Sequence, residues 1–518
     1  MALLHDLLAA GYFPKELPPP FSSKSFAQRL APVGGTASTA FRRPKWARPV
    51  TFTIAKPQGL RRRLAIVNPI HFYNQSLFVS SEWNLLSTHI NFSPLSLSKP
   101  VPDVSGLRAL VPGTGQSDLL QSRSQSRSMG KYTLVADISE FYPSIYTHSI
   151  PWALHGKASA KANLRSRTLL GNRFDKLLRD SQEGQTVGIA IGPDISLVTA
   201  EVVLTAIDVQ LDAKFKNKTF FRWMDEFEMS FVDYRSAEEG LAELQHTLAD
   251  FELRLNPRKT SISSAPFGYE STWVHELRSF ELAPSVRKQA RDLVRFFDLV
   301  FEHAAKNRGD HVVRYALARL RPTKLDPTNW LLYQQLLSHA MIHELTVTDQ
   351  YITNLLVGQQ LGLTVDKSLA ESALNFVIER SALLEQHHET AWALWGMLAF
   401  GITLSNKAAA AIEKVENSVV ALLCLDALQQ SLLPTTFSTT AWAGRMTAPD
   451  LSGEQWLLAY EANVKNWLPT VGGGDHVTSD PHFSQLKNLG VEFYTPVTRP
   501  ALPPTSIVPF AIPGARSV

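Results

Sequence analysis

The sequence has very little cysteine and no long apolar run. Cys424 is the only cysteine among 518 residues, which excludes an intramolecular disulfide and a cysteine-based zinc site. No run of 18 apolar residues occurs, and His5 and Asp6 interrupt the apolar first stretch. We therefore expect neither a membrane-spanning helix nor a signal peptide. These absences indicate a cytoplasmic protein that has no membrane partner.

The composition is that of an ordinary globular protein, with 44% hydrophobic and 19% charged residues. The length suffices for about two or three domains. Residues 1–130 hold 15 Lys and Arg against 5 Asp and Glu, so the other 388 residues carry a net charge of −6. A basic front half suits a phosphate-binding surface, although a merely solvated basic face has the same composition.

Acidic residues follow two apolar stretches that read as strands. The run YTLVA leads into Asp137, and the segment FRWMDEFEMSF places Asp225 and Glu226 in the turn of a β-hairpin. Three carboxylates gathered by neighbouring strands repel one another unless a cation lies between them. Mg²⁺, or Mn²⁺ in its place, would neutralise them, and two-metal sites perform phosphoryl transfer. The alternative for Asp137 is a structural cap or ion pair.

The segment DISEFYPSIYTHSIPWALHGK, which contains Asp137, resembles the palm motif of reverse transcriptases. It is most similar to the bacterial defence-associated group related to abortive-infection reverse transcriptases. The opening GYFPKELPPPF is similar to that group's first segment, and MDEF stands where the family has a Tyr/Val-x-Asp-Asp turn. The resemblance implies an α+β right-hand polymerase with fingers and a ferredoxin-like palm. Asp137, Asp225 and Glu226 would be its metal-binding catalytic residues.

The resemblance also implies nucleotide-binding residues. The segment KPQGLRRRLAIVNP is similar to the fingers, where an arginine grips the triphosphate, and we predict Arg63 for this role with Arg61 as second choice. Tyr142, five residues past Asp137, takes the position at which an aromatic ring excludes a 2′-hydroxyl. Lys259 lies in the strand that closes the palm and would neutralise or protonate the leaving pyrophosphate.

Two departures from the family pattern bear on function. The stretch GQTVGIAIGPDIS resembles the family's template-and-nucleotide loop, in which Gly192 would let the backbone approach the nucleotide. Ala190 and Ile191 replace the usual Pro-Gln pair, and Ile cannot form the hydrogen bonds of Gln. Glu226 replaces the second Asp of the turn and is one methylene longer. The first departure favours unusual template handling. With the second, Glu226 can still bind Mg²⁺ in a shifted geometry, and a polymerase that no longer catalyses is the alternative.

Residues 101–130 are rich in Ser, Gly and Gln and contain Arg123 and Arg127. We expect a loop whose two arginines contact nucleic acid. A mobile basic loop without such a role is the alternative.

The sequence from about residue 276 onward is nearly all helical in pattern. It predicts an all-α, helical-repeat-like C-terminal domain, although no strict repeat period is visible. The expected helices are Ser285–His303, Asp310–Leu320, Trp330–His343, Thr346–Leu361, Lys367–Leu384 and Thr390–Leu404, with further ones near 407–431 and 453–467. The predicted domains are 1–130 (N-terminal extension and fingers), 131–275 (palm), 276–495 (helical) and 496–518 (a Pro-rich tail).

The leading hypothesis is an RNA-directed DNA polymerase-like nucleotidyltransferase in antiphage defence. It would join dNTPs into a DNA product, without a template or from a protein hydroxyl as some relatives do. Four tyrosines of the helical half are candidates for such priming, although each also suits a core position: Tyr315, Tyr333, Tyr351 and Tyr460. The alternatives are a conventional enzyme copying a non-coding RNA and an inactive nucleic-acid-binding sensor or scaffold. By analogy with relatives, we expect a homo-oligomer and a second defence protein as partner.

Overall fold

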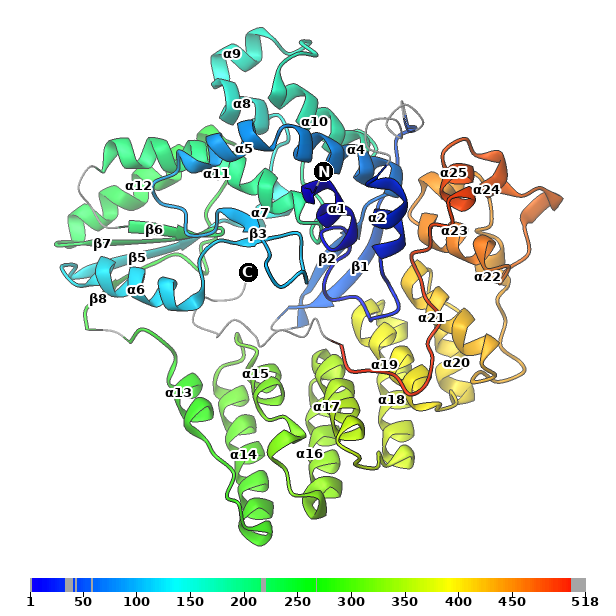
Figure 1. The fold of residues 1–518 in the computed structure, drawn as a ribbon. Coiled ribbons are helices and arrows are strands. Elements are labelled where there is room, and N and C mark those ends of the chain that lie inside the picture. Colours follow the sequence, from blue (N-terminus) through cyan, green and yellow to red (C-terminus); the bar gives the residue numbers. More distant parts are fainter. Residues whose placement is uncertain are drawn as a thin grey trace.

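The computed structural model describes residues 2–504 apart from 33–40, 42–43, 57–58, 216–219 and 267. The described chain is helix-rich α+β, with long helices around three small antiparallel sheets (Figure 1). Within these ranges, no helix is both long enough and apolar enough to cross a membrane. The α+β class agrees with the prediction from sequence.

The central sheet has four strands, β5 (Tyr132–Asp137), β6 (Phe220–Trp223), β7 (Glu226–Phe231) and β8 (Ser261–Ser264), in the order β6-β7-β5-β8. Helices separate β5 from the β6–β7 hairpin, and one helix separates the hairpin from β8. This sequence of elements and this strand order are those of a ferredoxin-like sheet, as predicted. The intervening helices are α7 (Phe141–Ser144), α8 (Ser149–His155), α9 (Lys157–Ala162), α10 (Leu170–Asp180), α11 (Ile195–Lys214) and α12 (Tyr234–Asp250).

The two faces of this sheet differ because side chains alternate along each strand. One face is apolar and packs against α12, where the Phe231 ring lies so close to Gly240 that a Cβ there would be 2.4 Å from it. The other face is polar and is covered in part by α6 (Gln116–Arg127), with Ser126 of α6 bonded to Ser230 of β7. Asp137 and Glu226 belong to the polar face.

A second hairpin joins the sheet region to the helical half. Its strands are β1 (Val50–Ala55) and β2 (Arg61–Ile66), which pair antiparallel. Helix α19 (His387–Phe400) packs against β1. The remaining elements before β5 are α1 (Ala2–Ala9), α2 (Lys24–Leu30), α4 (Pro69–Ser81), α5 (Trp83–Asn91), β3 (Pro100–Pro102) and β4 (Leu110–Pro112).

The helices after β8 form two layers. Helices α14, α16, α18 and α20 contact one another in series, and α15, α17, α19, α21 and α23 form a second series. This alternation produces the repeat-like array that the sequence predicted (Figure 1). The helices are α13 (Thr272–Ser279), α14 (Val286–Lys306), α15 (Val312–Arg319), α16 (Trp330–His343), α17 (Thr348–Gln360), α18 (Lys367–Ser381), α20 (Asn406–Ile412), α21 (Ser418–Gln429), α22 (Thr440–Ala443), α23 (Trp456–Val464), α24 (His476–Ser479) and α25 (Phe483–Asn488).

The end of the helical half returns to the first residues of the chain. The Phe493 ring packs against Tyr12 and Phe26, and Phe21 forms a β-bridge with Tyr494. Residues 496–504 contain neither helix nor strand, and most of the predicted Pro-rich tail, 505–518, lies outside the described residues.

Candidate active site

The three predicted carboxylates come together at one end of the central sheet. Asp137 ends β5 and pairs in register with Glu226, which begins β7. Directly opposed residues of an antiparallel pair have Cα atoms about 4.5–5.5 Å apart. The backbone N–H of Ile138 donates to the carbonyl of Asp225 at 3.2 Å, and all three acidic side chains are buried. The proximity of these three carboxylates therefore follows from strand pairing.

A cluster of buried charged residues, Arg222 with Glu201 and Asp208, stabilises the turn between β6 and β7. Arg222 is completely buried and forms paired hydrogen bonds to Glu201 and to Asp208 on α11. Its Nη1 also donates to the carbonyl of Met224 at 2.7 Å, and the Met224 N–H donates to Ser98 Oγ at 2.8 Å. Met224 has a positive φ of 53°, so these bonds fix a strained turn next to the carboxylates.

The carboxylates of this end of the sheet are only partly neutralised. Burial, reinforced by the charge of Asp137, raises the pKa of Asp225 to about 7. Burial also raises the pKa of Glu226 to about 7, against the opposing effect of Arg123. Asp225 Oδ1 is buried and has no hydrogen-bond partner among the described residues. A buried oxygen without a partner is costly unless a cation or donor reaches it.

Asp137 and Asp225 fit a divalent metal ion better than all three carboxylates together. Glu226 Oε1 is turned to Arg123 Nη2 at 3.3 Å, and Lys259 Nζ donates to Asp137 Oδ2 at 2.9 Å. In the described ranges, no group of three or more His, Cys, Asp or Glu side chains is arranged to hold a metal ion. Carboxylate oxygens are the ligands that Mg²⁺ prefers, and the free oxygen of Asp225 is available for it. Lys259 supplies a positive charge beside Asp137, from the turn that precedes β8 and not from the strand in which the sequence predicted it.

The predicted triphosphate-gripping residues, Arg63 and Arg61, need correction. Arg61 is bound to Glu389 of α19 through both ends of its guanidinium, at 2.6 and 2.8 Å, and Arg63 is exposed. Arg61 and Arg63 share one side of β2, and Arg62 lies on the other, since side chains alternate along a strand.

Arg62 is the arginine of β2 that faces the carboxylates. It is half-buried, and the burial lowers its pKa, while the nearby charges of Glu16 first and then of Asp225 and Asp137 raise it. In the described chain it forms no ion pair. Lys56, just after β1, is also close, since the charges of Lys259 and Asp137 influence its pKa, which burial lowers. The alternation that places Arg62 on the side of the buried Leu64 could have indicated it.

Tyr142 lies close to the carboxylates, whereas the close contact of Gly192 is with the N-terminal segment. Tyr142 is partly exposed in α7, and burial together with the charge of Asp225 raises its pKa, so the phenol is close to the carboxylates. Gly192 has a φ of 131°, and a Cβ there would lie 2.6 Å from Pro14. Its close approach is therefore to the N-terminal segment, whereas the sequence predicted an approach to nucleotide.

Arg123 and Arg127 do not lie in a loop. They belong to α6, and the Nε atoms of both bind Glu228 on β7, at 3.0 and 2.7 Å. Arg123 is 4% exposed and also contacts Glu226. Because sheet carboxylates engage both guanidinium groups, their position is structural and differs from the predicted basic loop open to nucleic acid.

Comparison with known proteins adds little to this geometry. No protein-family model matches the chain, and no curated protein matches it. Among solved structures, telomerase from Candida tropicalis in complex with a fragment of telomeric RNA aligns with 11% identity over 78% of this chain and 68% of its own. The apo form of that telomerase aligns with 10% identity over 81% and 72%. Both have a TM-score of 0.32, which is too low to assign a shared fold or function.

Proposed function

We propose that this protein is a nucleotidyltransferase of the reverse-transcriptase type, which adds nucleotides to a hydroxyl with release of pyrophosphate. One observation carries the proposal. The β5–β7 pairing brings Asp137 beside Asp225 in a ferredoxin-like sheet, and Asp225 keeps a buried oxygen without a partner. A purely structural ion pair would leave no such oxygen, since buried carboxylates are normally bonded.

The surrounding residues have distinct roles in this proposal. Asp137 and Asp225 would hold Mg²⁺ or Mn²⁺, which supplies charge stabilisation for phosphoryl transfer. Arg62 approaches the same carboxylates from β2 and binds the triphosphate, replacing Arg63 in that role. Lys259 stands beside Asp137 and donates to the departing phosphate oxygens. Tyr142 limits the space beside the sugar.

The finer assignments rest on the sequence resemblance. These are the use of dNTPs, a role in antiphage defence, and synthesis without a template or from a protein hydroxyl. Priming by the four candidate tyrosines has no support, because Tyr315, Tyr333, Tyr351 and Tyr460 are at most 8% exposed. A hydroxyl of this kind must be accessible to react.

A second candidate is a nucleic-acid-binding scaffold without catalysis. The contacts Glu226–Arg123 and Asp137–Lys259 favour it, because they already neutralise two of the three acidic side chains. The scaffold and the enzyme differ in one measurable property, the incorporation of nucleotides.

The test uses the purified full chain with Mg²⁺ and labelled dNTPs, with and without prior nuclease treatment. Incorporation that survives removal of all RNA and DNA supports untemplated synthesis, and incorporation lost with RNase supports RNA copying. Asp225→Asn should abolish either signal, whereas Asp212→Asn, an exposed aspartate of α11, should leave it unchanged. Absence of incorporation by the wild-type protein under every condition would overturn the enzyme and leave the scaffold.

A further inference from the structure

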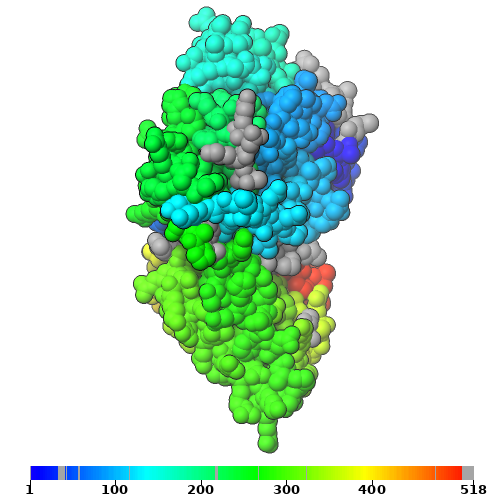
Figure 2. All heavy atoms as spheres, turned by 90° about the vertical axis from the view of Figure 1, so that its left-hand side faces the viewer, coloured from blue at the N-terminus to red at the C-terminus, as the bar shows by residue number. Residues whose placement is uncertain are grey.

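The segment from α8 to α10 is strongly basic and projects from the molecule. The 34 residues from Phe141 to Phe174 contain five Lys and Arg and no Asp or Glu. Helix α9 stands at the top of Figure 1, and this part of the chain forms the upper end of the molecule in Figure 2. Lys161, Arg165 and Arg167 are exposed and form no ion pair within the described residues. We call these three residues, with Lys157, the basic ridge.

The ridge is built on a tryptophan. The Nζ atoms of Lys157 and Lys161 lie 4.4 and 5.6 Å from the ring centroid of Trp152, close enough for cation–π attraction. These lysines are four residues apart and therefore share one side of α9. Lys157 donates to the backbone carbonyl of Asp250 at 2.6 Å, and it forms no ion pair with a carboxylate of the described residues. The ridge consequently presents unneutralised positive charge.

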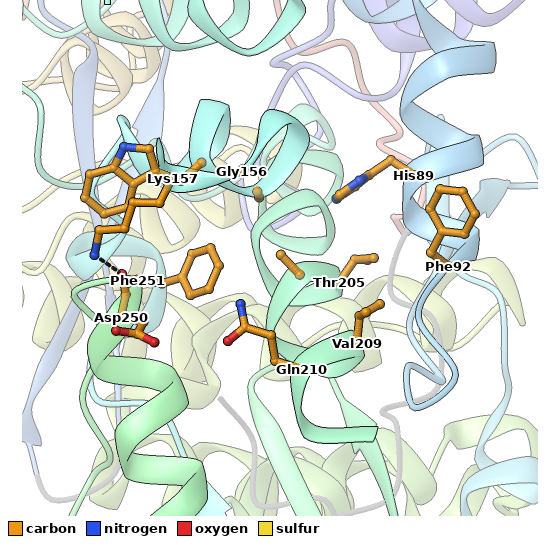
Figure 3. Close-up of a pocket in the computed structure, with 12 residues that line it drawn as sticks. His89, Phe92, Gly156, Lys157, Thr205, Val209, Gln210, Asp250 and Phe251 are labelled. Carbon is orange, nitrogen blue, oxygen red and sulfur yellow. Dashed lines mark hydrogen bonds between the residues drawn. The ribbon is translucent and has the colours of Figure 1, made fainter. Parts of the chain in front are cut away.

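A pocket of about 550 Å³ lies directly beside the ridge (Figure 3). Its aromatic lining residues are Phe92, Trp152 and Phe251, and Phe92 is 65% exposed. Gln210 and Asp250 add polar groups that can bind the edge of a base, and Asp250 is the one acidic side chain in the described lining. Pockets of this size accept small organic ligands, and an exposed phenylalanine offers a stacking surface.

This pocket is separate from the candidate active site. Its walls include residues of α11 and α12, and α12 packs against the apolar face of the central sheet. The carboxylates lie on the opposite, polar face. A ligand in the pocket therefore does not touch Asp137 or Asp225.

We propose that the ridge and pocket form a binding site for single-stranded nucleic acid. The ridge cations contact successive phosphates, and one unstacked base enters the pocket and stacks on Phe92. This pairing of a cationic track with an aromatic platform is what single strands require, whereas a duplex keeps its bases stacked and cannot fill the pocket. The proposal stands whether or not the carboxylates catalyse, because it uses none of them.

The test measures binding of fluorescent U20 RNA, dT20 DNA and a 20-base-pair duplex by anisotropy, from 50 to 200 mM salt. The triple variant Lys161→Ala, Arg165→Ala, Arg167→Ala should weaken single-strand binding at least tenfold. It should also reduce the slope of log affinity against log salt by about 2, since each single-strand phosphate contact contributes about 0.7. The matched control, Arg29→Ala, Lys367→Ala, Lys414→Ala, removes three exposed cations elsewhere and should bind like the wild type.

The pocket is tested separately with Phe92→Ala. Stacking of one base is worth about 1–3 kcal/mol, so affinity should fall about 5- to 100-fold with an unchanged salt slope. Phe376→Ala, which removes an exposed aromatic ring of α18, is the control. Asp225→Asn should bind like the wild type, which separates this site from the proposed enzyme.

The RNA and DNA probes decide which strand the site prefers, and preference for either supports it. Three outcomes overturn the proposal: equal losses in both triple variants, duplex binding as tight as single-strand binding, or no effect of Phe92→Ala.

Discussion

Two groups of buried acidic residues lie beside the β6–β7 hairpin, one on α11 behind it and one at its turn, and they are neutralised in opposite ways. Glu201 and Asp208 share the guanidinium of Arg222, and every one of their four oxygens has a donor. Asp225 has an oxygen that no described residue bonds, and its pKa is raised to about 7. The first group fixes the turn, and the second is left in need of positive charge.

The difference shows how a fold can hold a buried carboxylate whose missing hydrogen bond costs free energy of folding. Buried ion pairs are stable only when the hydrogen-bonding capacity of both partners is satisfied, as it is around Arg222. An unsatisfied carboxylate at the tip of the same hairpin survives because the neighbouring cluster prevents the turn from relaxing. The matched group is therefore expected to govern stability and the unmatched group to govern activity.

Loss of the matched cation should have the largest effect. Arg222→Met leaves Glu201 and Asp208 buried without a counter-charge and should destabilise the protein by about 3–5 kcal/mol. Urea unfolding measures this change. Arg173→Met, at a pair with Glu82 that is largely exposed on the arginine side, is the control and should cost less than about 1 kcal/mol. A loss of unfolding free energy as small for Arg222→Met as for Arg173→Met would contradict the stabilising role of the Arg222 cluster.

Removal of the unmatched charge should act in the other direction. The raised pKa of Asp225 means that the folded state holds its proton more tightly than the unfolded state, so wild-type stability falls as pH rises from about 4 to about 7. Asp225→Asn should remove that part of the fall and gain roughly 1–3 kcal/mol at pH 8, while incorporation is lost. Denaturant titrations at pH 4, 6 and 8 test the sign. A variant less stable than wild type at pH 8 contradicts it.

Separate substitutions of Arg62 and Arg63 test which side of β2 contacts the nucleotide. Arg62→Ala should lower kcat/KM for nucleotide about 30- to 100-fold, because it removes a bidentate contact to phosphate worth about 2–3 kcal/mol. Arg63→Ala, on the exposed side of the same strand, should change it less than about threefold. Steady-state kinetics with varied dNTP separates them, and the reverse ranking would restore the prediction from sequence.

Metal binding should stabilise the wild-type protein through the unmatched group. At 10 mM Mg²⁺ and pH 7.5 we expect about 1 kcal/mol, which corresponds to a concentration several times the dissociation constant. Thermal unfolding with Mg²⁺ and with EDTA measures the gain. Asp225→Asn should lose it, and an equal gain in that variant would place the metal elsewhere.

The smallest expected effect concerns a pair of intermediate exposure, Arg61 with Glu389. A double-mutant cycle with Arg61→Ala and Glu389→Ala should give a coupling energy of about 1 kcal/mol in unfolding free energy. Additive losses would show that the contact contributes nothing to the attachment of α19.

Much of the architecture could be predicted from local pattern. The strands leading to Asp137 and around Asp225 stand out because short apolar runs end in acidic residues, and antiparallel pairing then brings the two together. The helices of the second half were placed within a few residues, since amphipathic spacing persists there. Their two-layer stacking follows from the same spacing only once neighbouring helices are known.

The errors arose where a side chain's partner lies far away in the sequence. Arg61 is tied to Glu389, and Arg123 to Glu228, across separations that no local pattern reports. The Ser-rich composition around α6 favoured a loop, yet packing on the polar face of the sheet makes it a helix. Arg62 and Arg63 lie on opposite sides of β2 because side chains alternate along a strand. The Arg222 cluster has no local signature, because Arg222 lies on β6 and its partners Glu201 and Asp208 lie on α11.

The tie between β2 and α19 has a mechanical consequence. Two adjacent residues of β2 have different partners. Arg62 lies near the carboxylates, and Arg61 binds Glu389 of α19. A displacement of Arg62 is transmitted through the backbone to Arg61. A movement of β2 would therefore, through the Arg61–Glu389 contact, also displace helix α19 of the helical half.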